Sequence, residues 1–280
     1  MRLATIRQHG TTSAVRVDGS EYVTLPAPDV GALLGSATWR DDAMHSAGDR
    51  GSFADADVAP LVTRPSKIVC VGLNYRGHML EMGRELPEHP TLFAKFADSL
   101  IGARDSIELP DESDHVDWEA ELALVVGRRV RHADDDIAAA AIGGFAVIND
   151  VTMRDWQYRS SQWLQGKTFE RTAPLGPVLV TPDELPGTVW PDLTVRAAVN
   201  GEVVQSASTR DLVFHPVALV KYVSAIVTLH PGDVIATGTP GGVGHARTPP
   251  RYLGDGDTLT TDITHLGRCE NPVRSATVVS

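Results

Sequence analysis

The stretch Asp117-Trp118-Glu119-Ala120-Glu121-Leu122-Ala123-Leu124-Val125-Val126-Gly127 decides the fold of this chain and points to its chemistry. Its apolar run predicts a strand, and in a strand residues two apart face the same side. Glu119 and Glu121 therefore share a row with Ala123 and Val125. Two carboxylates that face into a fold repel each other and lose hydration unless a cation holds them. The pattern predicts a cation beside this pair.

A third carboxylate, Asp150, ends the apolar run of residues 145–149. Three carboxylates on strand ends form an oxygen-rich site for a hard divalent ion, so we expect Glu119, Glu121 and Asp150 to hold Mg²⁺ or Mn²⁺. Arg154 and Gln157 follow Asp150 at short spacing. A helical turn there would place both beside the metal, although on spacing alone each is more often an ordinary surface residue.

Composition and charge restrict the function classes. The chain has 280 residues, 42% hydrophobic and 22% charged, which predicts an ordinary globular core. A net charge of −11 argues against a nucleic-acid partner. No stretch reaches the roughly 20 apolar residues of a membrane span, and the N-terminus lacks a signal-peptide hydrophobic region. We therefore expect a cytoplasmic protein without a membrane partner. Cys70 and Cys269 form no metal or disulfide pattern, and Cys70 is expected to be buried.

Two domains are predicted, a small N-terminal domain over residues 1–64 and a catalytic domain over residues 65–280. Arg64-Pro65-Ser66 marks the boundary, and residues 67–73 read as the first buried strand beyond it. Few segments look helical, namely 29–34, 75–82, 134–141 and 216–228. Many look like strands, namely 3–7, 13–17, 22–25, 91–96, 106–109, 118–126, 144–149, 178–180, 194–200, 202–206, 233–237 and 258–263. The many strands and few helices do not alternate as in βαβ units, so the pattern predicts a mainly β fold with helices, of the α+β class.

Other polar residues are candidates for catalysis. His78 and Glu81 are neighbours on one helical face, and a carboxylate beside an imidazole raises its basicity, so the pair could activate a water. On spacing alone a surface ion pair is the commoner interpretation. Lys167 follows Gly166, but a lone lysine is usually exposed. The glycine-rich segment 237–244 fits a loop that lets the backbone approach a ligand, or a plain surface turn.

Six motifs, in order, resemble the fumarylacetoacetate hydrolase family. The resemblance extends from about residue 65 to the C-terminus. Its motifs are Gly72-Leu73-Asn74-Tyr75 with His78 and Glu81, Asp117 to Leu122, Asn149 to Gln157, Gly166 to Phe169, Pro174 to Pro177, and Pro231 to Pro240.

The resemblance implies a distorted β-roll catalytic domain, preceded by a small N-terminal domain, and usually a homodimer. It also implies Mg²⁺ or Mn²⁺ bound by Glu119, Glu121 and Asp150. The founding hydrolase branch has one more Asp ligand, seven residues before its catalytic His. Here Val71 occupies that position, so the chain resembles the shorter branch, in which the helix with His78 and Glu81 often acts as a lid.

Family substrates are mostly 2,4-diketo acids, so we expect hydrolysis of a C–C bond in acylpyruvates such as fumarylpyruvate, during breakdown of aromatic compounds. The products would be pyruvate and a second acid. In this hypothesis Glu81 orients His78, and His78 deprotonates the attacking water. Lys167 and Gln157 stabilise the oxyanion, with Arg154 beside them. Gly238 and Thr239 position the substrate carboxylate.

Two alternatives stay open. The same scaffold could be a decarboxylase or isomerase of oxo-diacids, such as oxaloacetate or 2-hydroxyhepta-2,4-diene-1,7-dioate. Those reactions need no attacking water, so the His78 and Glu81 pair favours hydrolysis modestly. The chain could also be a metal-dependent binding protein, against which Lys167 beside the pair argues. The distal half of the substrate would be bound by the lid and by loops near Gln162, Trp163 and Arg247.

Overall fold

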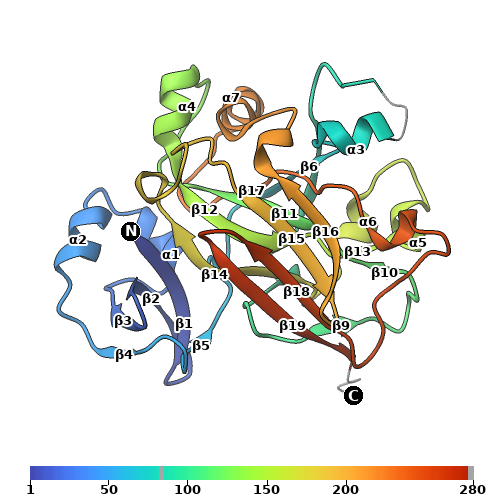
Figure 1. Ribbon diagram of the computed structural model, residues 1–280. Helices are drawn as coiled ribbons and strands as arrows, with labels where there is room; N and C mark the ends of the chain where they lie inside the picture. The colour runs from blue at the N-terminus through green and yellow to red at the C-terminus, as the bar shows by residue number, and fades with distance from the viewer. Residues whose placement is uncertain (82–84, 277–280) are drawn as a thin grey trace.

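The computed structural model describes residues 1–81 and 85–276, except for the side chains of His78, Leu80 and Glu81. Figure 1 shows a protein built mainly of strands, with short helices around them. This confirms the predicted fold class, a mainly β protein with helices.

A large sheet runs through the whole molecule. β5 (Asp57–Val58) pairs with β1 of this sheet, and β8 (Leu100–Ile101) pairs with β14. The main path across the sheet is β4 (Arg50–Ser52), β3 (Glu21–Thr24), β2 (Thr11–Asp18), β1 (Arg2–Gln8), β14 (Ala173–Val180), β12 (Ile142–Asn149), β11 (Ala120–Val126), β17 (Val234–Ala236), β6 (Ile68–Gly72) and β7 (Thr91–Lys95).

The N-terminal strands continue the sheet that carries β11 and β12. β1 pairs antiparallel with β14, with Arg2 opposite Val180 and Leu3 opposite Leu179. Leu3 also belongs to a buried cluster that includes Ala123 of β11. The two parts therefore share a sheet and a core. The domain boundary after residue 64 stays a prediction.

A second, five-stranded sheet packs against one face of the large sheet (Figure 1). Along β11, Leu122 and Leu124 belong to the core between the sheets, whereas Ala123 and Val125 belong to the core on the opposite side. This alternation is the one that the sequence predicts. The second sheet contains, in order, β16 (Glu202–Ser208), β15 (Thr194–Val199), β18 (Thr258–Ile263), β19 (Gly267–Ser275) and β9 (Ile107–Leu109).

Short elements complete the fold around the start of β11. A two-stranded sheet joins β10 (Val116–Asp117) to β13 (Thr152–Met153). The helices are α1 (Val30–Leu34), α2 (Trp39–His45), α3 (Arg76–Glu81), α4 (Asp135–Ala141), α5 (Arg154–Gln157), α6 (Leu164–Lys167) and α7 (Pro216–Ile226). The 3₁₀ turns are η1 (Ala97–Ser99), η2 (Pro182–Glu184), η3 (Thr209–Asp211) and η4 (Gly244–Ala246).

Most predicted elements occur close to their expected positions, with two informative differences. The strand expected over 118–126 begins at Ala120, because the chain first forms β10 and then passes Trp118 and Glu119 outside a regular strand. The short helix α6, which carries Lys167, was not predicted. Four residues give no helical periodicity, so tertiary contacts must set this turn.

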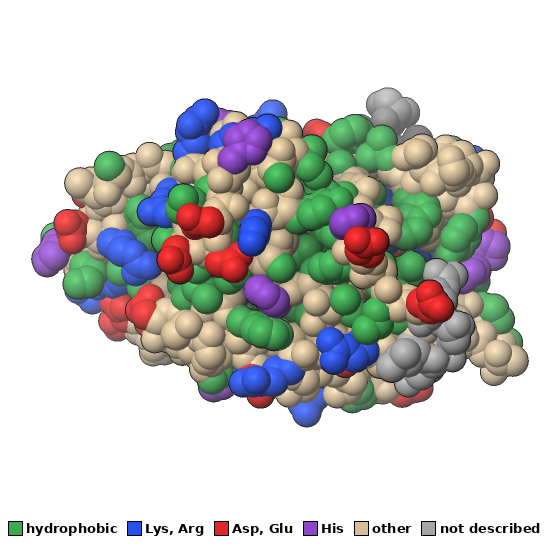
Figure 2. Space-filling model, turned by 90° about the horizontal axis from the view of Figure 1, so that it is seen from above, with side chains coloured by type: hydrophobic (Ala, Val, Ile, Leu, Met, Phe, Trp, Pro, Cys, Tyr) green, Lys and Arg blue, Asp and Glu red, His purple; other side chains and the backbone are tan. Residues whose placement is uncertain are grey.

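The surface and the helices add two observations. On the face shown in Figure 2, acidic side chains lie among basic and hydrophobic ones. The excess negative charge of the chain therefore forms no single acidic patch on that face. Among residues 1–81 and 85–276, none of the helices has the length and apolar character that crossing a membrane requires.

Candidate metal and substrate site

The three predicted metal ligands meet at one edge of the large sheet. Glu119 immediately precedes β11, Glu121 lies within it, and Asp150 immediately follows β12. These strands are antiparallel, with Ala120 opposite Asn149, so the start of one lies beside the end of the other. Each acid offers one carboxylate oxygen, and the three oxygens lie within 4.8 Å of one another. All three residues are buried.

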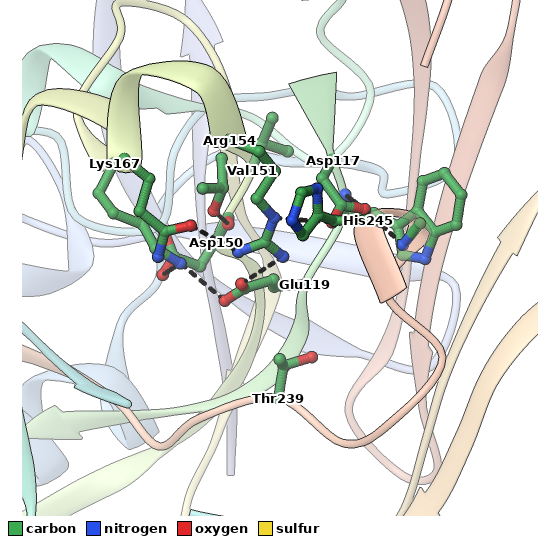
Figure 3. A network of polar contacts seen from close by, with 12 residues as sticks. Asp117, Glu119, Asp150, Val151, Arg154, Lys167, Thr239 and His245 are labelled. Atoms are coloured by element: carbon green, nitrogen blue, oxygen red, sulfur yellow. Dashed lines mark hydrogen bonds and ion pairs between the residues drawn. The ribbon is translucent and has the colours of Figure 1, made fainter. Parts of the chain in front are cut away.

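Three buried basic side chains, Lys95, Arg154 and Lys167, contact the acids. Figure 3 shows Arg154 and Lys167 beside Glu119 and Asp150. The Lys167 ammonium bridges two of the acids, 2.8 Å from Glu119 Oε2 and 2.9 Å from Asp150 Oδ2. Lys95 Nζ lies 2.7 Å from Asp150 Oδ1 and also donates to the Lys167 carbonyl oxygen. Arg154 Nη2 lies 2.7 Å from Glu119 Oε1. Both oxygens of Glu119 and of Asp150 thus contact a basic group.

Glu121 is the acid least compensated by positive charge. Burial raises its pKa well above the ordinary value, and the charges of Asp150 and Glu119 raise it further. Lys167 and the Gly238 N–H, which donates to Glu121 Oε2 at 2.7 Å, oppose this shift only in part. Without another cation Glu121 therefore tends to hold a proton.

Asp150 and Lys167 both favour their ionised forms. Burial by itself would raise the pKa of Asp150, but the charges of Lys167 and Lys95 outweigh it and lower that pKa. Burial likewise disfavours the charged form of Lys167, yet the neighbouring carboxylates Asp150 and Glu119 raise its pKa above the ordinary value. Lys167 is therefore an ammonium ion, which can donate hydrogen bonds but does not act as a base at neutral pH.

The donor set fits a hard divalent cation. Oxygen atoms are the ligands that Mg²⁺ and Mn²⁺ prefer, and Glu119, Glu121 and Asp150 each offer one. Each carboxylate oxygen can accept more than one contact, so its bond to a lysine or arginine leaves a lone pair for a metal. A bound cation would also favour the ionised form of Glu121. The residues do not select between the two ions.

A fourth acid, Asp117, fixes one side of the site. Its Oδ2 accepts from Arg154 Nε at 2.8 Å and from the His245 backbone N–H at 3.0 Å. Its Oδ1 accepts from the N–H groups of Trp118, at 2.8 Å, and Gly244, at 2.6 Å. One buried carboxylate therefore connects β10, α5 and η4.

The loop after β17 holds Gly238 and Thr239, whose predicted contact with the substrate carboxylate stays a prediction. Gly238 has φ +97°, and a Cβ there would lie 2.9 Å from the Val71 carbonyl oxygen, so only glycine fits without strain. Its N–H donates to Glu121. Thr239 Oγ1 donates to the Ala120 carbonyl oxygen at 3.0 Å. This side of the site is thus held by the start of β11 itself.

A pocket of about 260 Å³ opens beside the cluster, a size suited to a small metabolite. Five predicted site residues line it, namely Glu119, Arg154, Gln157, Lys167 and Thr239. Gln157 Oε1 accepts from Arg154 Nη1 at 2.9 Å, so these two bind each other as well as facing the pocket. The remaining lining residues are Val71, Gly72, Leu73, Phe93, Tyr158, Trp163, Val243, His245 and Ala246.

Comparison with known proteins identifies the family. The family model described as "Fumarylacetoacetate (FAA) hydrolase C-terminal" matches residues 67–274. This chain belongs to the fumarylacetoacetate hydrolase family. The family assignment confirms the resemblance seen in the motifs, and this family's enzymes act on small molecules.

Individual relatives point to particular reactions. "Oxaloacetate tautomerase Fahd2a, mitochondrial" from Rattus norvegicus is 47% identical over 213 residues, which cover 76% of this chain and 67% of that protein. Fumarylacetoacetate hydrolase from psychrophilic Exiguobacterium antarcticum superposes with a TM-score of 0.88 at 31% identity, covering 99% of this chain and 100% of that one. The 5-carboxymethyl-2-hydroxymuconate delta-isomerase from Mycobacterium smegmatis superposes with a TM-score of 0.81 at 34% identity. The match covers 99% of this chain and 100% of that one.

The predicted catalytic pair lies on α3, and its side chains fall outside the described part of the structure. The helix follows β6, and its first turn is held where the Gly77 N–H donates to Asp211 Oδ2 at 2.8 Å. Asn74, just before α3, donates to the carbonyl oxygens of Phe214 and Thr237. The roles of His78 and Glu81 therefore stay predictions.

Three residues of the site were missed in the sequence. Lys95 is the last residue of β7 and lies one residue before the end of the strand predicted over 91–96, and a charged residue near the end of an apolar run is the signal that could have marked it. Asp117 opens the deciding stretch but was treated only as the start of a strand. His245 lies within a loop of glycine and proline, where spacing gives no indication of what a side chain faces. Of the loop residues expected to bind the distal half of the substrate, Trp163 lines the pocket.

Proposed function

We propose that this chain is a divalent-metal-dependent enzyme that interconverts the keto and enol forms of a 2-oxo diacid such as oxaloacetate. The observation that carries the proposal is the buried carboxylate cluster around Lys167, which opens on a pocket of metabolite size. The 47% identity to a rat protein named oxaloacetate tautomerase supports the isomerase alternative better than acylpyruvate hydrolysis.

The proposed reaction moves one proton and breaks no carbon–carbon bond. When the enol forms, the C3–H bond breaks, its electron pair becomes the second bond between C2 and C3, and the oxygen on C2 gains a proton. Negative charge therefore builds on that oxygen in the transition state. A divalent ion, when bound, supplies electrostatic stabilisation for this charge.

The residues of the chain have separate tasks in this scheme. Lys167 remains an ammonium ion and stabilises the charge on the C2 oxygen as a hydrogen-bond donor. Arg154 and Gln157 present a guanidinium and an amide to the pocket and orient the substrate. Gly238 and Thr239, held against β11, position the carboxylate next to the keto group.

Proton transfer at C3 needs a base, and the candidate for it is His78, predicted as the base that activates water, with Glu81 as its orienting partner. Tautomerisation would use this pair to take the proton from carbon instead of from a water. We expect His78→Ala to keep metal affinity and lose turnover, whereas Glu119→Ala loses both. Isothermal titration with Mn²⁺ and a turnover assay check this. Full turnover by His78→Ala would remove the proposed role of the imidazole.

Hydrolysis of acylpyruvates remains the second candidate, supported by the likeness to the Exiguobacterium antarcticum hydrolase. The same donors would stabilise a tetrahedral oxyanion, and His78 would activate water. The two reactions differ in their products, because only hydrolysis releases pyruvate from an acylpyruvate.

A metal-supplemented panel of oxaloacetate, fumarylpyruvate and acetylpyruvate separates the candidates. We expect Mg²⁺ or Mn²⁺ together with the protein to accelerate the loss of enol absorbance of oxaloacetate above the protein-free rate. Chelation of the metal should remove the effect. Cleavage of fumarylpyruvate without faster tautomerisation would instead establish the hydrolase, and carbon dioxide release would establish a decarboxylase. A protein that binds these acids without turnover would be a binding protein only.

Two further expectations rest on the sequence and the resemblance. We propose a homodimer, which light scattering coupled to size-exclusion chromatography tests directly. The cytoplasmic location also stays a prediction, and the rat relative is named as a mitochondrial protein. Fractionation of the native cell would decide between the compartments.

A further inference from the structure

One polar side chain of the pocket, His245, has no role in the proposed reaction. It lies in η4, and its backbone N–H donates to the same Asp117 oxygen that accepts from Arg154 Nε. Figure 3 shows His245 beside Arg154 and Asp117. Because Asp117 is fully buried and also accepts from the Gly244 N–H, the turn that carries the imidazole is fixed against the pocket wall.

The imidazole is oriented by aromatic neighbours from two other segments. His245 Nδ1 lies 2.9 Å from the Tyr252 hydroxyl, and the ring packs 5.4 Å from that of Tyr158. Burial raises the pKa of Tyr252, so its phenol keeps the proton that it can donate to Nδ1. Partial burial, and then the charge of Arg154, lower the pKa of His245, so the ring is neutral at pH 7. With Tyr252 as donor, the ring proton resides on Nε2.

We propose that the Nε2–H of His245 binds the distal carboxylate of the 2-oxo diacid and makes the enzyme selective for diacids over monoacids. This inference rests on the proposed function. The cations Lys95, Lys167 and Arg154 are already paired with Asp117, Glu119 and Asp150. In the proposed reaction Lys167 and Arg154 also serve the reacting end of the substrate, which leaves the second carboxylate to another donor on the pocket wall.

His245 and the metal ligand Glu119 line the same pocket. Arg154 connects Glu119 to Asp117, and Asp117 accepts from the backbone N–H of His245, so this residue lies beyond Arg154 from the reacting end. Arg154 Nε and the His245 backbone N–H share Asp117 Oδ2 as acceptor, so the guanidinium lies close to this residue and its positive charge favours an anion there. A neutral donor beside that charge is suited to holding a carboxylate.

The test compares two 2-oxo acids that differ in the distal group. Oxaloacetate has a carboxylate there, and phenylpyruvate has an uncharged ring. In the Mg²⁺-loaded full chain, we expect His245→Phe to lower the ratio of kcat/KM for oxaloacetate to that for phenylpyruvate about tenfold, the loss that fits one hydrogen bond to a charged group. His245→Gln, which keeps an N–H donor, should restore most of the ratio.

A binding measurement excludes a merely structural effect. Oxalate has no distal arm, so its affinity for the Mg²⁺-loaded protein, measured by titration calorimetry, should be equal in the wild type and in His245→Phe. An unchanged kcat/KM ratio, or an equal loss for both acids, would overturn the role of His245 while leaving the proposed function intact. A wild-type protein without metal-dependent turnover of oxaloacetate would overturn both.

Discussion

At the scale of single residues, the site is a buried cluster in which acids outnumber bases by one. Its members are Asp117, Glu119, Glu121, Asp150, Lys95, Arg154 and Lys167. A proton on Glu121 neutralises the metal-free cluster, whereas a divalent ion with all acids ionised leaves one positive charge. That positive charge favours an anionic 2-oxo acid as the next ligand. The proton and the metal therefore compete for Glu121.

Lys95 offers a stability test of this balance. Lys95→Met leaves Asp150 with one ammonium partner instead of two, so we expect the free energy of unfolding of the metal-free protein to fall by about 3 kcal/mol. Saturating Mg²⁺ should restore part of the loss, because the ion also neutralises Asp150. Urea denaturation with and without Mg²⁺ measures both effects.

The control for this test is Lys221→Met, which removes an exposed ion pair with Asp135 at 2.9 Å. Surface pairs contribute about 0–1 kcal/mol, so this variant should unfold almost like the wild type. Equal losses of unfolding free energy in Lys95→Met and Lys221→Met would show that the buried ion pair of Lys95 stabilises the protein no more than an exposed one.

At the scale of elements, the sequence predicted what depends on local pattern. Alternation in 119–126 placed Glu121 in one row with Ala123 and Val125, and the structure agrees. Glu119 is different, because it lies ahead of β11 and joins the site through the pairing with β12. The contacts of Lys95 and His245 come from segments far apart in the chain, which no local pattern encodes. The carboxylates were therefore predictable from local pattern, and the family resemblance singled out Arg154 and Lys167, whereas Lys95, Asp117 and His245 were missed.

Helix α7 provides a pH-dependent test at this scale. Its N-cap is His215, whose Nδ1 accepts from the Ala218 N–H at 3.3 Å. Partial burial lowers the pKa of His215 below the ordinary 6.5, although Asp135 opposes the shift. A lowered histidine pKa means that the unfolded chain binds the proton first. The stability contributed by this cap is thus present above about pH 6.5 and is lost as the pH falls through the folded pKa.

The matched variant is His215→Asn, which keeps a capping side chain but does not titrate. We expect the wild type to lose more unfolding free energy than this variant between neutral and mildly acidic pH. Urea denaturation at a series of pH values gives the comparison. If the free energy of unfolding of the two proteins falls equally with pH, the titration of His215 does not affect the stability of the helix cap.

At the scale of the whole molecule, the large sheet joins the N-terminal strands to the site. Removal of residues 1–64 would expose the edge of β14 that pairs with β1, together with the apolar side chains that Leu3 and Val30 cover. We expect a fragment of residues 65–280 to aggregate or to melt well below the full chain, which should unfold in one transition. Circular dichroism during heating tests this. A fragment as stable as the full chain would instead establish the predicted independent domain.

The central place of β11 and β12 in the large sheet has a consequence for hydrogen exchange. β11 pairs with β12 and β17, and β12 pairs with β11 and β14, so neither strand lies at an edge. Amides in such strands exchange with solvent only when much of the sheet opens. Glu121 lies within β11, and Glu119 and Asp150 adjoin the ends of these strands, so we expect their amides to be among the slowest to exchange. We therefore expect the arrangement of the three carboxylates to persist while surface loops fluctuate, so that the site is already formed before a ligand binds.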